Sequence, residues 1–283
     1  MSIPTGPGQG AEAVDFPDYL SVVAIARNEG LHLREWLEYH LLVGVQRFYF
    51  YDNASTDNTR ELLEPYIRSG TVVYRLVTGS RMQLLAYADA IGRCRSRTRW
   101  LAMIDLDELI VPLDADSLPE LLREYEGYPA LGINWVMFDS NGHDEPPREH
   151  DALMAANYTT VRRGSHDPQT GDRHIKSIVS PREVVMLHNP HGALYKGKRQ
   201  AVDENFEPIT GPRTARHSSR RVQVNHYYTC SRAEYQRKMN TPRSDNGELR
   251  TFNEEMLNFP DPDRDDAIAR FLPGLRARLG LVR

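Results

Sequence analysis

The stretch Trp100-Leu101-Ala102-Met103-Ile104-Asp105-Leu106-Asp107-Glu108 joins an apolar run directly to an acidic motif. The apolar run predicts a buried strand, and residues two apart on a strand share a face, so Asp105 and Asp107 should lie side by side at its carboxyl end. Two neighbouring carboxylates repel each other unless a cation lies between them. Hard oxygen ligands suit Mg²⁺ or Mn²⁺ that also binds phosphates, so the motif indicates a divalent metal and a phosphorylated substrate. A strand that simply ends in a solvated acidic turn is the alternative explanation.

The sequence before this motif alternates between strand and helix patterns. Strands are expected over residues 20–26, 47–51, 71–76 and 99–104, and helices over residues 33–41, 59–69 and 82–94. This alternation is typical of a parallel sheet with helices on both faces, in which ligands bind beyond the carboxyl ends of the strands. Polar clusters follow three of these ends, at residues 27–29, 52–57 and 105–108, and we expect them to meet in one crevice.

The second half of the chain is less regular. Strands are expected over residues 131–138, 177–179, 184–187 and 222–226, and helices over residues 233–239 and 265–279. Pro273 should break or kink the last helix. Residues 161–172 and 196–216 have the composition of long loops.

Composition sets further bounds on the class of protein. The chain has 283 residues, of which 40% are hydrophobic, which is enough for a large α/β domain. The net charge of −4 argues against a general nucleic-acid binder. The two cysteines form no disulfide framework, and neither a transmembrane run nor a signal peptide is evident, so we expect a cytoplasmic protein. Oligomeric state is not indicated.

With these residues placed, the chain resembles the GT-A class of nucleotide-sugar glycosyltransferases, and more closely the glycosyltransferase 2-like and family 92 group. The resemblance covers about residues 21–239. It is carried by an ordered set of motifs: Ala26-Arg27-Asn28-Glu29, Trp36-Leu37-Glu38-Tyr39-His40, Tyr51-Asp52-Asn53-Ala54-Ser55-Thr56-Asp57, Asp105-Leu106-Asp107-Glu108, residues 135–143, Lys176-Ser177-Ile178-Val179 and Asn225-His226-Tyr227-Tyr228.

The resemblance implies a fold and a reaction. The fold is a Rossmann-like α/β domain, with a mostly parallel sheet, helices on both faces and a smaller mixed region on the acceptor side. Residues 18–112 would form the nucleotide-sugar-binding half and residues 113–245 the acceptor-side half, between a flexible tail over residues 1–17 and a helical extension over residues 246–283. The implied reaction moves a sugar from a nucleotide diphosphate sugar, with UDP-sugar as the expected donor, to a hydroxyl of a glycan or small molecule.

The resemblance also implies roles for residues on the donor side. Asp107 is the implied direct ligand of Mn²⁺ or Mg²⁺, Asp105 would contact the ribose or reach the metal through water, and His226 would complete the metal shell. The implied nucleotide contacts are Ala26, Arg27, Asn28, Asp52, Asp57, Gln83, Asp105 and Lys176, with Asp52 facing the base. The residue types also allow simpler roles: a structural histidine at His226, a surface lysine at Lys176 and a helix cap at Asp57.

The acceptor side is less defined. An inverting reaction needs a carboxylate to deprotonate the acceptor hydroxyl, and Asp139 and Asp144 are the candidates, whereas Glu108 is expected to be structural. The related families usually have glycine at the position of Asp139, so the acceptor stays open, as do the donor sugar and the configuration.

Other assignments remain open beside these. His188 and His191 are rival candidates for metal or acceptor contact. Two alternative functions are a catalytically idle nucleotide-binding module and a haloacid dehalogenase-like phosphohydrolase, which also places Asp-x-Asp after an apolar strand.

Overall fold

Strands and helices alternate along the first half of the chain, as predicted. In the computed structural model, which describes residues 16–148 and 152–281, these elements are β1 (Asp18–Ala26), α1 (Gly30–Leu42), β2 (Arg47–Asn53), α2 (Thr59–Arg68), β3 (Val72–Val77), α3 (Gln83–Cys94) and β4 (Thr98–Met103). The four strands are parallel and lie in the order β3-β2-β1-β4. The expected tail over residues 1–17 falls almost entirely outside the described residues.

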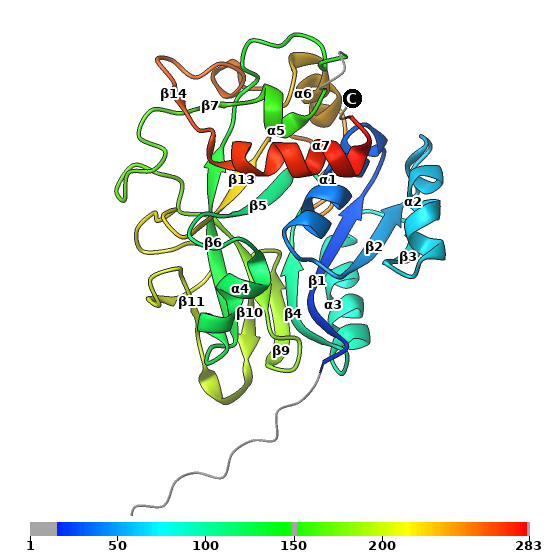
Figure 1. The fold of residues 1–283 in the computed structure, drawn as a ribbon, viewed down its shortest axis with the longest axis vertical. Helices are drawn as coiled ribbons and strands as arrows, with labels where there is room; N and C mark the ends of the chain where they lie inside the picture. The colour runs from blue at the N-terminus through cyan, green and yellow to red at the C-terminus, as the bar shows by residue number, and fades with distance from the viewer. Residues whose placement is uncertain (1–15, 149–151, 282–283) are drawn as a thin grey trace, which may run out of the picture.

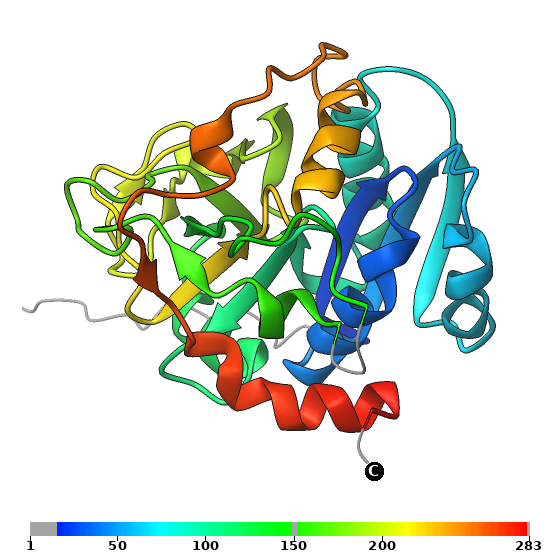
Figure 2. The same ribbon diagram turned by 90° about the horizontal axis from the view of Figure 1, so that it is seen from above.

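The helices cover both faces of this sheet (Figures 1 and 2). Successive side chains of β1 point to opposite faces, so Val22 packs in the same core as Trp36 of α1, and Val23 in the core that contains Tyr87 of α3. Because both faces are buried, β1 reads as a continuous apolar run and not as an alternating one. The predicted α/β class is therefore confirmed.

The second half extends the sheet with mixed strand directions. The further strands are β5 (Glu108–Pro112), β6 (Ala130–Met137), β8 (Ile175–Val179), β11 (Ala201–Val202), β12 (Pro208–Ile209) and β13 (Val222–His226). In the described part of the chain the sheet has ten strands, and β8 runs antiparallel between β4 and β6. β13 pairs antiparallel with β5 and parallel with β6, which brings the sequence around His226 back to the acidic motif.

Smaller elements complete the fold. They are α4 (Leu118–Leu122), α5 (Met154–Asn157), β7 (Thr160–Val161) paired with β14 (Asp263–Arg264), β9 (Val184–Asn189) paired with β10 (Gly192–Tyr195), α6 (Arg232–Met239) and α7 (Leu272–Leu279). β5 and α4 were not predicted, and the expected loop over residues 196–216 contains the short hairpin of β11 and β12.

One sequence-based expectation about the acidic motif is wrong. β4 ends at Met103 and β5 begins at Glu108, so Asp105 and Asp107 lie in a tight turn between two strands and not on a strand. The Glu108 carboxylate accepts a hydrogen bond from the Asp105 backbone N–H at 2.9 Å, and the Asp105 carbonyl accepts one from the Glu108 N–H at 3.3 Å. These two bonds fold the motif back on itself, which local sequence periodicity does not show.

The expected helix over residues 265–279 is also divided. A 3₁₀ segment, Ala267–Phe271, leads into α7, and Pro273 lies in the first turn of α7, where its missing N–H costs no helical hydrogen bond. α7 lies along α1 in both views (Figures 1 and 2), with the ring centres of Tyr39 and Phe271 5.9 Å apart. The C-terminal segment is thus only partly helical and closes one face of the core.

Candidate active site

Elements far apart in the sequence meet at the turn that carries the acidic motif. Trp36 of α1 donates its indole N–H to the Asp105 carbonyl at 3.0 Å, which fixes the turn against the first helix. In the pairing of β5 with β13, His226 lies directly opposite Glu108. We refer to the resulting group as the acidic site; it comprises Asp105, Asp107, Glu108, Lys176, His226 and Lys238.

Asp105 is held by a buried lysine. Lys176 Nζ on β8 lies 2.6 Å from Asp105 Oδ2 and 3.2 Å from Glu108 Oε2, and the lysine side chain is only 2% exposed. The other Asp105 oxygen accepts hydrogen bonds from Gln83 Nε2 at 3.0 Å and from the Tyr87 hydroxyl at 3.4 Å. Lys176 is therefore a buried residue, and the alternative of a surface lysine is wrong. Gln83, a predicted nucleotide contact, here donates a hydrogen bond to Asp105 of the acidic motif.

Asp107 has a different lysine as its counter-ion. Lys238 of α6 forms an ion pair with Asp107 Oδ2 and also donates to the Tyr228 carbonyl at 2.9 Å. Its ammonium lies 4.0 Å from the centre of the Tyr228 ring, a cation–π distance. His226 Nε2 lies 3.5 Å from the same Asp107 oxygen. Each aspartate of the motif is thus paired with a different lysine, and Lys176 is shared with Glu108.

These pairs decide the charges of the site. Removal from water alone would raise the pKa of Asp105. The attraction of the Lys176 ammonium is stronger than this effect, so the pKa of Asp105 lies below its usual value. Dehydration acts in the same direction on Asp107, yet Lys238 and His226 hold its pKa well below the usual value. Burial raises the pKa of Glu108, against the opposing effect of Lys176. Both motif aspartates are therefore ionised, and the two lysines remain charged.

Two buried atoms of the acidic site lack a partner. Within the described residues, neither Glu108 Oε1 nor His226 Nδ1 has a hydrogen bond, although the two atoms lie 3.9 Å apart. Unpaired buried polar atoms are uncommon in folded proteins and are a mark of strain or of a site for a water, an ion or a ligand. The simpler role of His226, a histidine whose ring is fully satisfied by the fold, is therefore not what the structure shows.

The donor set fits a divalent cation. Carboxylate oxygens and imidazole nitrogen both bind Mn²⁺, and ligand atoms in an octahedral shell with bonds of about 2.1 Å lie about 3 Å apart. The 3.5 Å between Asp107 Oδ2 and His226 Nε2 is close to this separation. A cation there would take the position on Asp107 that the Lys238 ammonium holds.

The first two polar clusters are joined by Asn28. Its backbone N–H donates to Ser55 Oγ at 2.9 Å, and its side-chain oxygen accepts from the Thr56 N–H at 2.7 Å. Removal from water and repulsion by the Asp107 carboxylate raise the pKa of the neighbouring Glu29. Asn28 therefore joins the first two clusters, and the single crevice expected for all three stays a prediction.

Asp57 holds two helices together. Its two oxygens accept hydrogen bonds from the Gly30 N–H at the start of α1 and the Thr59 N–H at the start of α2, both at 3.0 Å. Partial burial alone would raise its pKa, but these bonds hold the pKa of Asp57 below its usual value. A Cβ at Gly30 would collide with Asn58, so glycine allows the close approach. The N-cap residue of α2 is Asn58, so Asp57 is not the helix cap that the residue type allows. Its carboxylate instead ties the first residues of α1 and α2 together, and nucleotide contact stays a prediction.

Asp52 lies at the carboxyl end of β2 and is 2% exposed. One of its oxygens accepts from the Ser55 N–H and the other from the Tyr74 hydroxyl, both at 2.8 Å. Ala26 is its partner across the β1–β2 pairing, and Arg27 follows on the surface. Their contacts with a nucleotide stay predictions.

The two predicted catalytic carboxylates lie in a different environment. Asp139 accepts hydrogen bonds from the Phe259 N–H at 2.9 Å and from the Thr160 hydroxyl, so it holds separate segments together. Asp144 has an 85% exposed side chain and lies 3.2 Å from Arg232. These contacts favour structural roles, and the assignment of either residue as the catalytic base stays a prediction.

An aromatic side chain lines the acidic site. The Trp135 ring centre lies 4.6 Å from that of His226 and 5.4 Å from that of His191. Burial lowers the pKa of His191 to about 4, which keeps the imidazole neutral at pH 7. His188, the other rival ligand, is exposed. His191 is therefore the member of that pair that lies near the predicted metal ligands.

Sequence reasoning missed Lys238. Its helix was predicted, but a lysine on an amphipathic helix is ordinarily a solvated residue, and no local pattern marks this one. The ion pair with Asp107 depends on the return of the chain through β13, which places α6 over the acidic turn.

Residues 24–259 match glycosyltransferase family 92. The chain belongs to this family, as its motifs predict. The glycosyltransferase family 92 protein RCOM_0530710 of Ricinus communis is 32% identical over 178 residues, which are 58% of this chain and 29% of that protein. Galactan beta-1,4-galactosyltransferase GALS1 of Arabidopsis thaliana is 28% identical over 103 residues, which are 33% of this chain and 21% of that protein. The chain spans less than a third of the length of these relatives.

Solved structures show partial similarity. S. aureus TarS in complex with UDP has a TM-score of 0.37 and 15% identity, covering 58% of this chain and 47% of that one. GalNAc-T7 with UDP, GalNAc and Mn²⁺ has a TM-score of 0.41 and 12% identity, covering 75% of this chain and 43% of that one. Both scores lie below 0.5, so the family assignment rests on the sequence match.

Among residues 16–148 and 152–281, no helix combines the length and apolar character that a bilayer crossing requires. The expected cytoplasmic location stays a prediction.

Proposed function

We propose that the chain is a metal-dependent glycosyltransferase that moves a sugar from a nucleotide diphosphate sugar, with a UDP-sugar as the expected donor, to a hydroxyl of a glycan or small molecule. The observation that carries this proposal is the acidic site itself. Two ionised aspartates, two lysines and an incompletely paired histidine gather beyond the strand ends of a family 92 chain.

Each charged residue has a role in this proposal. Asp107 and His226 would hold Mn²⁺ or Mg²⁺, with Asp105 beside them, and the bound cation would neutralise charge that develops on the leaving diphosphate. Lys176, which is fixed between Asp105 and Glu108, would hold the turn and add positive charge beside the diphosphate. Lys238 would turn from Asp107 to the diphosphate oxygens, where an ammonium is a good point-charge partner.

The acceptor side is proposed from the sequence. Asp139 and Asp144 remain the candidates for the base that deprotonates the acceptor hydroxyl. If Asp139 acts only through its hydrogen bonds to Thr160 and Phe259, Asp139→Asn will lower the stability of the fold more than the rate of transfer at saturating acceptor. The donor-binding step should be unchanged in Asp144→Asn.

Thermal shift with UDP, with and without Mn²⁺, tests donor binding. A bound ligand at 100 times its Kd stabilises the fold by about 2.7 kcal/mol, so stabilisation by UDP should require the metal. Asp107→Asn should abolish the metal-dependent part, whereas Asp116→Asn, which changes an exposed aspartate of similar sequence context, should not. Metal-dependent stabilisation that persists in Asp107→Asn would overturn the assignment.

Turnover then separates the alternatives. A panel of UDP-sugars incubated with Mn²⁺ should show release of UDP from at least one donor. UDP binding without any release would favour the idle nucleotide-binding module. Release of inorganic phosphate from a phosphomonoester, without use of UDP-sugars, would favour the phosphohydrolase.

A further inference from the structure

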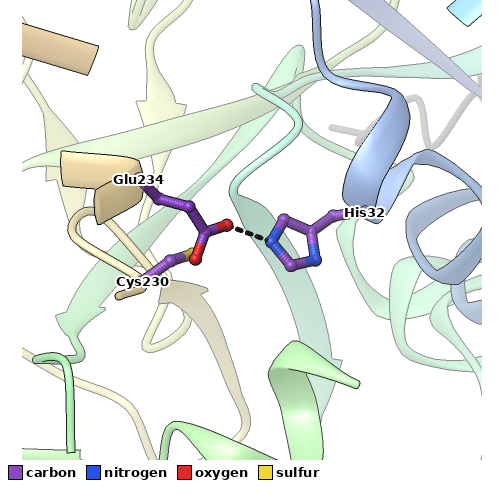
Figure 3. A group of neighbouring side chains, drawn as sticks. All are labelled: His32, Cys230 and Glu234. Carbon is purple, nitrogen blue, oxygen red and sulfur yellow. Dashed lines mark hydrogen bonds and ion pairs between the residues drawn. The ribbon is translucent and has the colours of Figure 1, made fainter. Parts of the chain in front are cut away.

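A second group of metal-binding side chains lies at the junction of α1 and α6. His32 comes from α1, Glu234 from the first turn of α6 and Cys230 from the connection between β13 and α6 (Figure 3). One ligand atom from each residue lies within 4.8 Å of the other two. All three side chains are largely buried, and His32 Nε2 lies 2.5 Å from Glu234 Oε1.

The carboxylate of this group is held in a fixed orientation. Glu234 Oε2 accepts hydrogen bonds from the Ser231 hydroxyl at 2.5 Å, the Ser231 N–H at 3.1 Å and the Tyr158 hydroxyl at 3.2 Å. Glu234 Oε1 is the atom that faces His32 (Figure 3). The bonds with Ser231 belong to the capping box at the start of α6. They fix the carboxylate with Oε1 directed at His32, and hydrogen bonds to the second oxygen also orient carboxylates that bind metals.

The cysteine is held in a strained position. Cys230 has a φ of +48°, in the left-handed region that costs a residue other than glycine on the order of 1 kcal/mol. Its thiol donates to the Tyr227 carbonyl at 3.2 Å, and its sulfur lies within 4.8 Å of a Glu234 carboxylate oxygen (Figure 3). This backbone conformation is less stable than an ordinary one, and in it the Cys230 side chain points its sulfur toward the Glu234 carboxylate and the His32 imidazole.

The surroundings carry an excess of negative charge. Burial and the carboxylates of Glu234 and Asp107 hold the pKa of the Cys230 thiol well above its usual value, against the opposing effect of Lys238. The neutral thiol is therefore the form of Cys230 in the metal-free protein, and a bound metal ion would have to displace its proton.

We propose that His32, Cys230 and Glu234 form a binding site for one Zn²⁺ ion, separate from the acidic site. Tetrahedral zinc, with bonds of about 2.0–2.3 Å, places its ligand atoms about 3.3–3.7 Å apart. The ligand atoms now lie between 2.5 Å and 4.8 Å from one another, so binding requires shifts of about 1 Å. Three protein ligands leave a fourth position for water.

Zinc binding here is a proton exchange. The ion displaces the thiol proton of Cys230 and the proton that His32 shares with Glu234, and both protons pass to the solvent. Thiolate and imidazole ligands favour Zn²⁺ over Mg²⁺ or Mn²⁺, which prefer the oxygen-rich acidic site. Because Lys238 lies one helical turn after Glu234, the ion would clamp the helix that carries Lys238 onto α1.

The test is a metal titration of the full chain after removal of metals with EDTA. Calorimetry should show one Zn²⁺ bound per chain, and Co²⁺, used as a visible substitute, should give the near-ultraviolet absorption of a thiolate-to-metal charge transfer. Cys230→Ser should abolish this absorption and weaken Zn²⁺ by more than the ~10–100-fold that loss of an outer hydrogen-bond partner costs. Cys94→Ser, which changes the other buried free cysteine, is the matched control and should leave both signals intact.

Two further variants separate the possible outcomes. Asp107→Asn should keep the zinc site, because Asp107 belongs to the acidic site. His32→Gln should weaken Zn²⁺ like Cys230→Ser, and it provides the second measurement if Cys230→Ser does not fold without metal. The proposal is overturned if no Zn²⁺ binds at stoichiometric amounts, or if binding survives Cys230→Ser and His32→Gln but is lost in Asp107→Asn. Either result would mean that His32 and Glu234 form only an ion pair.

Discussion

Replacement of Lys238 by methionine should tighten Mn²⁺ binding to the free protein. The ammonium of Lys238 is paired with Asp107, the predicted direct metal ligand, and must leave before a cation can bind there. Methionine keeps a long apolar stem against Tyr228 but carries no charge. The substitution therefore removes a competitor of the metal without opening a large cavity.

The size of the effect follows from the charges. Two unit charges about 4 Å apart interact by about 4 kcal/mol at an effective dielectric constant of ~20. Hydration of the ammonium when it leaves Asp107 offsets part of this interaction energy. Both Lys238 and Asp107 already keep about a fifth of their side-chain surface exposed to water. About half of the interaction energy, on the order of 2 kcal/mol, should remain as the cost of displacing Lys238 before Mn²⁺ binds. Its removal corresponds to ~30-fold tighter Mn²⁺ binding.

Calorimetric titration of the metal-free protein measures this change directly. Lys238→Arg keeps the positive charge and should leave Mn²⁺ affinity near that of the unchanged protein. Lys198→Met removes an exposed lysine and controls for net charge. UDP binding at saturating Mn²⁺ should weaken in Lys238→Met if the ammonium turns to the diphosphate. Equal or weaker Mn²⁺ affinity in Lys238→Met would refute the reasoning, because Lys238 would then position Asp107 and not compete for it.

Three further changes test the fold around the site. Lys176→Met leaves the Asp105 and Glu108 carboxylates without their buried counter-ion and should lower the free energy of unfolding by about 3–5 kcal/mol in urea denaturation; a loss under about 1 kcal/mol would contradict the pairing. Burial lowers the pKa of His40 from 6.5 to about 4, so below pH 6.5 the unfolded chain binds a proton that the folded chain does not. Stability should therefore fall by about 3 kcal/mol as the pH drops from 6.5 to 4, and His40→Gln should flatten that part of the curve. Glu204 accepts three backbone N–H bonds at 2.8–3.0 Å from the segment that enters β13, so Glu204→Ala should cost roughly 3–5 kcal/mol by thermal or urea unfolding, and a neutral result would show that water replaces it.

The first half of the fold could be predicted because its signals are local. β1 and β4 are buried on both faces and appear as continuous apolar runs, and each helix between strands carries its own periodicity. The short strands after β4 could not be predicted in the same way. β5 has only five residues, and it becomes a strand because β13, more than a hundred residues later, supplies its hydrogen bonds.

The same distinction applies to the site. The clusters around Asn28, Asp52 and Asp105 could be placed together because the ends of neighbouring parallel strands meet whatever the side chains are. No comparable rule of strand order predicts the ionic partners of the motif. Lys176 and Asp105 are 71 residues apart, and Lys238 and Asp107 are 131 residues apart. A lone aspartate pair therefore indicates a place for positive charge, but only the folded chain shows that two lysines already supply it. Under the proposed function, metal affinity at this site would therefore be a competition between a protein ammonium and a divalent ion, and α6 would set the outcome through Lys238.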